Sequence, residues 1–400
     1  MKLGGRFDLT YCSNIHAGES WAQVSSALAA SLPRIREQLG TDGPFGIGLR
    51  LSAAAARDLE APDALGAFRA FLRDGNYYVP TINGFPYGAF HGTRVKERVY
   101  LPDWRSDERV EYTNRLARLL AAVAADRGET EASISTVPGA FRTEIRSDVD
   151  VAAMADRMLS HAACLKRLYE DTGVRIALAI EPEPACHIET VDDAIAFFRG
   201  YLFDADRIAS AARADRSALS REEVARHVGV CLDTCHMAVE FEHPADAFSR
   251  LADEGIGVYK VQLSSALRLL GGSGTGAPRA LLGRFADDTY LHQVVTSGAS
   301  GLTRYTDLPD ALDAADQGDV ANDAEWRVHF HVPIFLAAMS GFETTQAYLA
   351  SVLDVLKRTS ACRCLEVETY TWDVLPAEYR TTDVCTAIAR ELAWVREVMA

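Results

Sequence analysis

Val228-Gly-Val-Cys-Leu-Asp-Thr-Cys-His236 is the segment that decides the fold of this chain and points to its chemistry. Its first five residues form an apolar run of the kind that builds buried strands. Asp233 and His236 follow, three residues apart. A strand that brings a carboxylate and an imidazole to one point places two ligands of divalent metals side by side. The segment therefore predicts a buried strand with metal ligands at its carboxyl end.

The same ending recurs in other strand-like runs. Runs 177–183, 259–263, 327–331 and 364–368 are largely apolar and carry acidic, amide or imidazole side chains near their ends, namely Glu181, Glu183, Gln262, His329, His331, Glu366 and Glu368. Between the last two we prefer Glu368 as a ligand, because it lies closer to the strand end. Several such endings on successive strands predict one shared site.

Strand-like runs alternate with amphipathic helical segments along almost the whole chain. The runs are 7–12, 45–51, 77–83, 132–137, 175–181, 228–233, 257–263, 327–332 and 363–369. Apolar residues at three- and four-residue spacing predict helices over 21–39, 63–73, 108–126, 149–172, 191–202 and 344–359. This alternation is typical of parallel strands with helical crossovers, and near eight units it favours a closed (β/α)8 TIM barrel over an open sheet.

Nine runs are present for eight strand positions. The spare run is 327–332, because the span from Gln262 to Arg363 is much longer than one strand–helix unit. We therefore expect an elaborated loop region after the seventh strand, at approximately residues 265–335, which includes the glycine-rich patch 271–276. No internal repeat or linker divides the sequence, so residues 1–400 are predicted to form a single TIM-barrel domain.

Composition narrows the functional classes. A net charge of −15 is unfavourable for tight, non-specific nucleic-acid binding, and 48% hydrophobic residues are enough for a large core. The eight cysteines include no CxxC pair, so we expect reduced, buried thiols and no cysteine-rich zinc site. The N-terminus has no apolar signal-peptide core and no apolar stretch is long enough to span a bilayer. We expect a cytoplasmic protein without membrane insertion.

The loop after the third strand combines aromatic and basic residues. It reads Asn83-Gly-Phe-Pro-Tyr-Gly-Ala-Phe-His-Gly-Thr-Arg-Val-Lys-Glu-Arg98, with Phe85, Tyr87 and Phe90 as aromatic walls. Aromatic side chains exclude water and arginine binds oxyanions, so we interpret the loop as a lid over a polar or anionic substrate. The alternative is a surface loop with solvated charges. The predicted substrate-binding residues are His16, Asn83, His91, Arg94, Lys96 and Glu183.

The strand-end residues predict a divalent-metal site. The active site of such a barrel lies at the carboxyl ends of its strands, where Glu181, Asp233, Gln262 and Glu368 would converge. Carboxylates with neutral N or O ligands suit Mn, Zn, Mg or Fe and do not select among them. The alternatives are a helix N-cap for Asp233 and a surface position for His329 and His331, which lie on one face of their run.

These motifs resemble the xylose isomerase-like TIM-barrel superfamily, which includes sugar isomerases, epimerases and endonuclease IV-type phosphodiesterases. Over nearly the whole length the sequence resembles more specifically the EboE family of metabolite traffic proteins. The motifs that carry this resemblance are Tyr11-Cys-Ser-Asn-Ile-His16, Asn83-Gly-Phe-Pro-Tyr87, His91-Gly-Thr-Arg-Val-Lys96, Glu181-Pro-Glu-Pro184, Asp233-Thr-Cys-His-Met-Ala-Val-Glu240, Lys260-Val-Gln-Leu-Ser-Ser265 and Val328-His-Phe-His-Val332.

The resemblance implies roles for individual residues. Glu181, Asp233 and Glu368 match metal carboxylates of the superfamily, and His236 matches the histidine of its Asp-x-x-His element. Glu181 and Glu368 would also be the catalytic acid/base pair of an isomerase. Gln262 stands where the sugar enzymes have a metal histidine. Because an amide oxygen is a weaker ligand than imidazole, the metal would be held more loosely, or His329 and His331 would compensate.

Three hypotheses follow for the function. The first is a divalent-metal-dependent isomerase or epimerase that acts on a small polar secondary-metabolite precursor. The family is tied to metabolite traffic or maturation, so other proteins of the same gene cluster are candidate partners. The second is a metal-dependent phosphodiesterase or phosphatase, in which two or three metals activate water. The third is a non-catalytic carrier of the metabolite.

Overall fold

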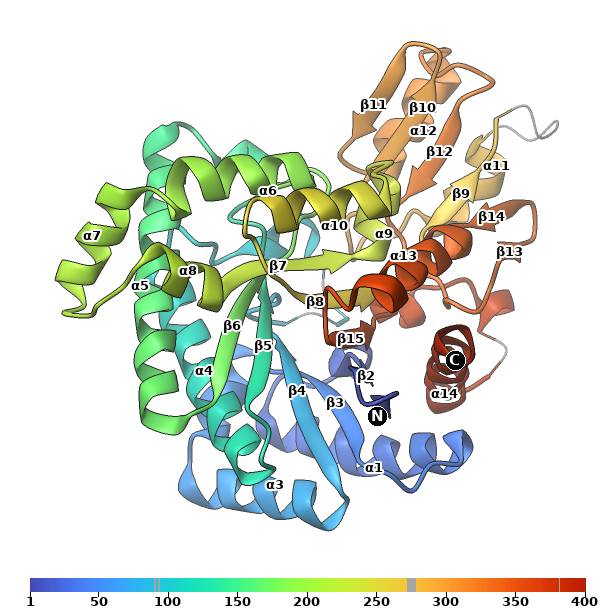
Figure 1. Cartoon of the computed structure of the whole chain (residues 1–400). Coiled ribbons are helices and arrows are strands. Elements are labelled where there is room, and N and C mark those ends of the chain that lie inside the picture. Colours follow the sequence, from blue (N-terminus) through green and yellow to red (C-terminus); the bar gives the residue numbers. More distant parts are fainter. Residues whose placement is uncertain (90, 93, 272–277, 381) are drawn as a thin grey trace.

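Eight parallel strands form the barrel in the computed structural model, which describes residues 1–89, 91–92, 94–271, 278–380 and 382–400 (Figure 1). The strands are β2 (Phe7–Tyr11), β3 (Phe45–Arg50), β4 (Tyr77–Asn83), β5 (Glu131–Thr136), β6 (Arg175–Ile180), β7 (Val228–Asp233), β8 (Val258–Leu263) and β15 (Cys364–Val367). β15 pairs with both β8 and β2, and a parallel bridge from Cys12 to Gly48 joins β2 to β3. The predicted (β/α)8 barrel is confirmed. A short strand, β1 (Lys2–Leu3), pairs antiparallel with β2.

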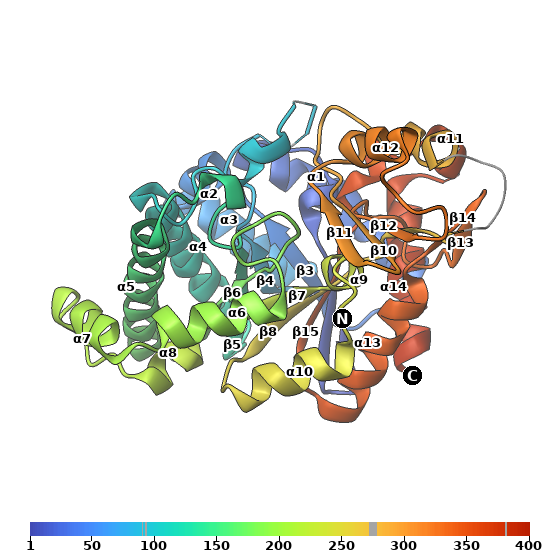
Figure 2. The ribbon, with the colours of Figure 1, turned by 90° about the horizontal axis from the view of Figure 1, so that it is seen from above.

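Helices surround the barrel on the outside (Figures 1 and 2). The helices of the barrel are α1 (Trp21–Leu39), α2 (Ala53–Leu59), α3 (Pro62–Asp74), α4 (Asp107–Asp126), α5 (Asp148–Thr172), α6 (Val191–Phe197), α7 (Ala205–Ala214), α8 (Arg221–His227), α9 (Thr234–Val239), α10 (Pro244–Asp253), α13 (Gln346–Thr359) and α14 (Val384–Met399). The 3₁₀ turns are η1 (Ser13–Ile15), η2 (Lys96–Tyr100), η3 (Arg142–Glu144), η5 (Gly283–Phe285), η6 (Tyr370–Asp373) and η7 (Ala377–Tyr379), and η4 (Phe198–Leu202) is π-helical. In the described ranges, no helix is both long and apolar enough to cross a bilayer.

Local sequence signals set the helix ends. At the start of α1, Ser20 accepts a hydrogen bond from the Gln23 backbone N–H, and the Gln23 side chain accepts one from Ser20 in return. The helix ends at Gly40, whose φ of 59° lies in the left-handed region that glycine adopts without steric cost. Leu28, Leu32 and Ile35 lie on its buried face. These signals explain why the predicted helix 21–39 has the observed bounds.

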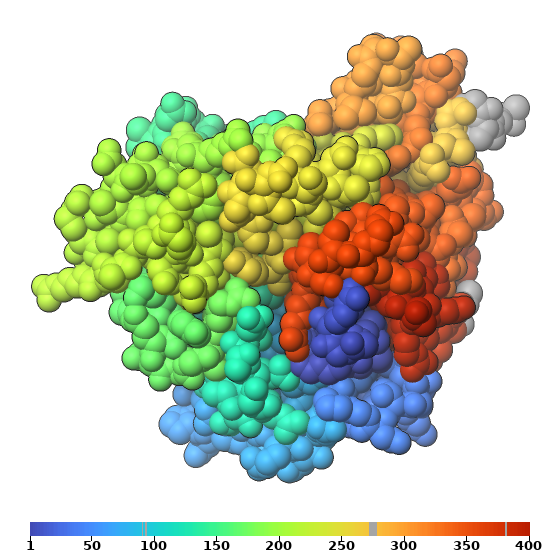
Figure 3. All heavy atoms as spheres, in the orientation of Figure 1, coloured from blue at the N-terminus to red at the C-terminus, as the bar shows by residue number. Residues whose placement is uncertain are grey.

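The segment after β8 forms a second, antiparallel sheet. Its strands, in spatial order, are β11 (Gly301–Tyr305), β10 (Val294–Gly298), β12 (Glu325–Val328), β9 (Leu267–Leu269), β14 (Phe342–Thr344) and β13 (Ala338–Met339). α11 (Pro278–Leu282) and α12 (Leu308–Gln317) accompany it, and Figure 3 shows this part, in orange, standing out from the body of the protein.

The enlarged region after the seventh strand is confirmed, but it is folded as a sheet where the sequence analysis expected a loop. The spare run 327–332 contributes β12 to this sheet and not to the barrel. The other strands of this sheet have only two to five residues each, too few for a periodic pattern, which is why the sequence analysis did not predict them. Of the predicted glycine-rich patch 271–276, residues 272–276 lie outside the described residues, as does Phe90.

A buried ion pair occupies the interior of the barrel. Lys260 Nζ lies 2.5 Å from Glu366 Oε1 and donates a hydrogen bond of 3.0 Å to Ser135 Oγ. Both charged side chains are completely shielded from solvent. Gly48 gives the pair room, since a Cβ there would lie 1.8 Å from Glu366 Oε2. The close approach of β2, β3 and β15 at this level therefore depends on a residue without a side chain.

A buried acid on α14 makes the stability dependent on pH. Glu391 accepts hydrogen bonds from Thr369 Oγ1 (2.6 Å) and from Ile334 N (3.2 Å). Burial raises the pKa of Glu391 to about 7 from 4.5, although these hydrogen bonds oppose the shift. The folded state thus favours the protonated acid, and this stabilisation is complete below pH 4.5 and is lost as the pH rises to 7.

Glu391→Gln is therefore expected to flatten the pH dependence. The wild type should lose about 3 kcal/mol more free energy of unfolding than the variant between those pH values. Urea denaturation at several pH values measures the difference. The matched control is Glu397→Gln on the exposed face of the same helix, which should keep the wild-type slope. An unchanged slope in Glu391→Gln would contradict the assignment.

Candidate metal centre and pocket

Three carboxylates meet at the carboxyl ends of the barrel strands. Glu181 follows β6, Asp233 ends β7 and Glu368 follows β15. One oxygen from each lies within 4.8 Å of the others, and all three residues are buried. Because the carboxyl ends of parallel strands meet at one face of the barrel, residues far apart in the sequence reach the same point.

The two carboxylate oxygens of Asp233 differ in their hydrogen bonding. Its Oδ1 caps α9 by accepting from the backbone N–H groups of Cys235 (2.8 Å) and His236 (3.0 Å), and it also accepts from Ser264 Oγ (2.7 Å). Its Oδ2 is buried and has no hydrogen-bond partner among the described residues. The N-cap and the metal ligand are thus compatible interpretations of the same residue.

Glu368 is held in position by two amides. Asn14 Nδ2 and Asn83 Nδ2 donate to its Oε1 at 2.8 and 2.9 Å. Asn83 is the last residue of β4 and Asn14 lies in η1 after β2, so two separate segments orient this carboxylate. Glu181 differs, because its Oε2 is buried without a partner in the described part of the chain.

The carboxyl groups of this cluster shift one another's pKa values. Burial, followed by the nearby Glu368 and Asp233 charges, raises the pKa of Glu181 well above its usual value. Burial and the Asp233 and Glu366 charges do the same to the pKa of Glu368. Burial also works to raise the pKa of Asp233, but His236, His331 and the Ser264 hydrogen bond hold it below the usual value.

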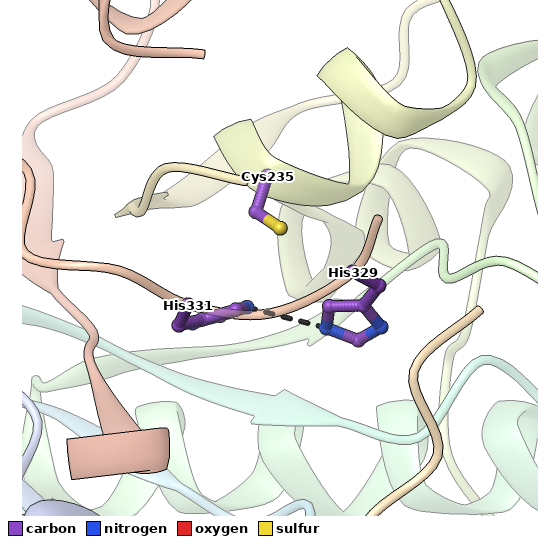
Figure 4. A group of neighbouring side chains, drawn as sticks. All are labelled: Cys235, His329 and His331. Carbon is purple, nitrogen blue, oxygen red and sulfur yellow. Dashed lines mark hydrogen bonds between the residues drawn. The ribbon is translucent and has the colours of Figure 1, made fainter. Parts of the chain in front are cut away.

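Three histidines lie beside the carboxylates. His329 Nε2 is 3.1 Å from His236 Nε2 and 3.3 Å from His331 Nε2. Figure 4 shows the ring nitrogens of His329 and His331 facing each other, with the Cys235 sulfur pointing toward the space between the rings. Cys235, His329 and His331 each offer an atom within 4.8 Å of the other two. Burial raises the pKa of Cys235 well above its usual value, which keeps it a thiol.

The hydrogen bonds at the outer side of each ring define its tautomer. His236 Nδ1 faces Pro182 O at 3.0 Å and His331 Nδ1 faces Glu368 O at 2.9 Å, and a carbonyl oxygen only accepts. Gln293 Nε2 donates to Pro184 O, which leaves its Oε1 to accept from His329 Nδ1 at 2.6 Å. All three Nδ1 atoms therefore carry hydrogen.

The geometry fits a divalent metal. Burial and the neighbouring imidazoles lower the pKa of His329 well below its usual value, and burial lowers that of His331 to about 4, so these rings are neutral. The Nε2 atoms of the neutral rings of His329 and His331 therefore carry lone pairs, and at 3.3 Å apart they repel each other unless a cation lies between them. The buried oxygens Glu181 Oε2 and Asp233 Oδ2 have no hydrogen-bond partner in the described part of the chain, and a cation would satisfy them as well. Imidazole nitrogens oriented from behind by carbonyl oxygens are typical of metal sites.

A pocket lies beside the carboxylates and histidines. Asp233 and His331 do not line it, and its charged, amide and imidazole side chains are Glu181, Glu183, Glu368, His236, His329, Asn14, Asn83 and Lys96. The loops above the strand ends contribute apolar and aromatic walls, namely Phe85, Pro86, Val95, Val99, Tyr100, Tyr290, Leu291 and Tyr370. A concave site with few converging polar groups and apolar walls is the usual form of a small-molecule site.

The other predicted site residues are distributed around this pocket. Gln262 lies in register with Asp233 and Glu366, and its Oε1 accepts from Cys231 Sγ at 3.1 Å. Glu183 accepts from Tyr100 OH at 2.8 Å and is grouped with His236 and His329.

Most of the predicted substrate-binding residues with basic or imidazole side chains do not line the pocket. Lys96 lines the pocket, but its Nζ is 2.6 Å from Asp307 Oδ2. Arg94 is exposed and His91 is half-buried, and neither lines the pocket. His16 bonds to Tyr11 OH at 3.1 Å, and burial lowers its pKa to about 4.

Sequence reasoning missed several residues of the site. Tyr290 and Gln293 come from the segment after η5, which was assigned to a loop region. Tyr370 lies just after Glu368, and its ring centroid is 4.6 Å from that of His331. Lys260 begins one of the motifs that carry the EboE resemblance, but the resemblance implied no role for it. An aromatic residue two positions after a strand-end acid is the one signal that could have indicated Tyr370.

No protein-family model matches the chain, and the comparison with curated proteins found no match. The resemblance to the EboE family is therefore not confirmed. Among solved structures, the chain is similar to a xylose isomerase-like TIM barrel protein from Mycobacterium smegmatis in complex with magnesium. The two are 11% identical, with a TM-score of 0.51 over 100% of this chain and 98% of that one. This likeness supports the xylose isomerase-like barrel fold.

Two further structures match at lower similarity. A xylose isomerase domain protein from Planctomyces limnophilus is 12% identical, with a TM-score of 0.49 over 98% of this chain and 95% of that one. A D-allulose 3-epimerase from Methylomonas sp. in complex with D-allulose is 12% identical, with a TM-score of 0.46 over 98% of this chain and 97% of that one.

Proposed function

We propose that this chain is a divalent-metal-dependent enzyme that isomerises or epimerises a small metabolite carrying neighbouring oxygen groups. The observation that carries the proposal is the group Glu181, Asp233 and Glu368, whose oxygens lie within 4.8 Å of one another beside a pocket. Two of these carboxylates have buried oxygens without partners in the described part of the chain. Buried oxygens without hydrogen-bond partners, placed this close together, favour a bound cation.

The chain's own residues supply proton transfer. Isomerisation next to a carbonyl needs one group to remove a proton and another to return one. Glu181 and Glu368 come from β6 and β15, which β7 and β8 separate, so they approach a ligand from different directions around the barrel. Burial raises the pKa of both carboxyl groups above the usual value, which strengthens them as proton acceptors. Asn14 and Asn83 hold Glu368 in place for this role.

The residues that would hold the metal are Glu181, Asp233 and Glu368, with His236, His329 and His331 beside them and Gln262 as a weaker amide donor. A bound divalent metal would neutralise the carboxylates and polarise a carbonyl oxygen of the substrate. The solved xylose isomerase-like protein from Mycobacterium smegmatis contains magnesium, which supports a divalent ion here.

The sequence resemblance to the EboE family adds a biological setting to the proposal. It suggests that the substrate is a secondary-metabolite precursor and that the reaction belongs to its traffic or maturation. Proteins of the same gene cluster would then be partners.

A phosphodiesterase or phosphatase is the second candidate. The observation that favours it is a second group of metal donors beside the carboxylates. The ring nitrogens of His236, His329 and His331 form this group. Room for a second metal beside the first is typical of phosphoester hydrolysis. The number of bound metals therefore distinguishes the two candidates.

Elemental analysis of wild type and Asp233→Asn tests the metal site. Asparagine retains the Oδ1 atom that caps α9 and removes the charge at Oδ2, so the fold should survive. We expect about one metal per chain in the wild type and at least roughly 100-fold weaker affinity in the variant. Two or three metals would turn the assignment toward the hydrolase, and Glu391→Gln is the matched control for loss of a buried acid. A wild type that takes up no Mn²⁺, Zn²⁺, Mg²⁺ or Fe²⁺ would contradict the proposal.

A further inference from the structure

We infer that the substrate is amphiphilic, with an oxygen-bearing head at the carboxylates and an apolar body against the pocket walls. This inference rests on the proposed function and specifies its substrate class. The polar groups of the pocket come from the strand ends, whereas Phe85, Val95, Val99, Tyr290 and Leu291 come from the loops above them. A ligand that reaches Glu181 and Glu368 therefore passes between apolar side chains.

The apolar walls are fixed in place. The backbone N–H groups of Val95 and Lys96 both donate to Thr289 O, at 2.9 and 3.0 Å, which joins the loop after β4 to the segment before β10. The rings of Tyr290 and Tyr370 pack with centroids 5.2 Å apart, and those of Phe85 and Tyr100 with centroids 5.6 Å apart. A preformed apolar wall binds an apolar group without the entropic cost of ordering it.

Charge in the pocket disfavours a phosphorylated substrate. Lys96 is the only lysine or arginine among the described lining residues. Its Nζ is already 2.6 Å from Asp307 Oδ2 and donates to Asp287 O at 2.9 Å. A phosphate would thus bring negative charge toward three carboxylates without a cation from the chain to pair with it.

Hydrogen bonding disfavours a free sugar over the length of the pocket. The Nδ2 atoms of Asn14 and Asn83 donate to Glu368, and Asn83 Oδ1 accepts from the Phe85 backbone N–H. The hydroxyl groups of a sugar chain beside Val95, Val99 and Leu291 would lose water without gaining partners from these side chains. An alkyl or aryl body has no hydroxyl groups to dehydrate, and its binding is favourable because it removes apolar surface from water.

A pair of hydroxamates with the same chelating head tests the inference. Calorimetry would compare acetohydroxamate with 4-phenylbutanohydroxamate on the full chain loaded with Mn²⁺. We expect the phenyl compound to bind roughly 30-fold tighter, from the apolar area that it buries. Leu291→Asn should remove most of this preference and leave acetohydroxamate unchanged. Leu302→Asn, which changes an exposed leucine on β11, should leave both affinities unchanged.

The binding measurements distinguish failure of the amphiphilic substrate from failure of the metal-dependent enzyme. Metal-dependent binding of both compounds with equal affinity would overturn the amphiphilic substrate and leave the metal centre intact. Tighter binding of fructose 1-phosphate or of inorganic phosphate than of the phenyl compound would overturn it as well. Absence of metal-dependent binding of either hydroxamate would overturn the proposed function and the inference together.

Discussion

Lys260→Met is expected to lower the free energy of unfolding by about 3–5 kcal/mol at neutral pH, because it leaves a carboxylate alone inside the barrel. In the wild type, Lys260 and Glu366 form a completely buried ion pair with an N–O distance of 2.5 Å. Without the lysine, Glu366 either stays charged in an apolar environment or takes up a proton. Uptake of a proton becomes more costly as the pH rises, whereas the cost of the buried charge does not change, so the loss should be smaller near pH 5 than near pH 8.

The double variant Lys260→Met/Glu366→Leu separates the unpaired charge from simple loss of packing. Replacing both partners of a buried ion pair by apolar residues of similar size is often neutral or stabilising. We therefore expect the double variant to recover most of the stability that either single variant loses. Guanidinium denaturation followed by tryptophan fluorescence measures all four proteins. Additive losses would show that the two side chains do not form the pair described here.

Lys260 also influences the candidate catalytic residues. Its positive charge opposes the effect of burial on Glu181 and Glu368 and draws the pKa values of both downward. Glu366, the ion-pair partner of Lys260, acts in the opposite direction on Glu368 and raises its pKa.

Glu181→Gln and Glu368→Gln are each expected to reduce proton exchange by roughly 100- to 10,000-fold, the usual contribution of a positioned acid or base. The measurement is the incorporation of deuterium from heavy water into an α-hydroxy ketone. D-fructose and 1-hydroxy-4-phenylbutan-2-one are suitable probes, because they share a reacting head and differ in the body. Glu242→Gln, which changes an acid that accepts from the Val191 backbone N–H and does not line the pocket, is the control and should exchange at the wild-type rate.

The same variants distinguish an enzyme from a carrier. A carrier would bind its metabolite as tightly after Glu181→Gln and Glu368→Gln as before, and the wild type would catalyse no exchange. An enzyme would lose exchange while its circular dichroism and thermal unfolding stayed unchanged. Wild-type exchange that persists in both variants would refute the assignment of these carboxylates as the acid/base pair.

Local patterns were sufficient for the barrel. The run 77–83 and the helix 21–39 have the bounds of β4 and α1, because apolar periodicity, a capping box and a terminal glycine all act within a few residues. The helix predicted over 191–202 is present as α6 and the π-helical η4 together. In contrast, the strands β9, β12 and β14 pair over separations of dozens of residues, and nothing local marks them as neighbours.

The sequence by itself determined the barrel and the kinds of metal donor at its strand ends, because parallel strands bring their carboxyl ends to one face whatever the details of packing. Only the tertiary structure decided which side-chain atoms are left for a ligand, because the others are already held in hydrogen bonds or ion pairs. Asp233 keeps one oxygen for a ligand because the other caps α9, and Lys96 is unavailable because Asp307 binds it. It likewise decided the apolar walls and the second sheet. These features arise from contacts between residues far apart in the chain, to which composition, spacing and periodicity are insensitive.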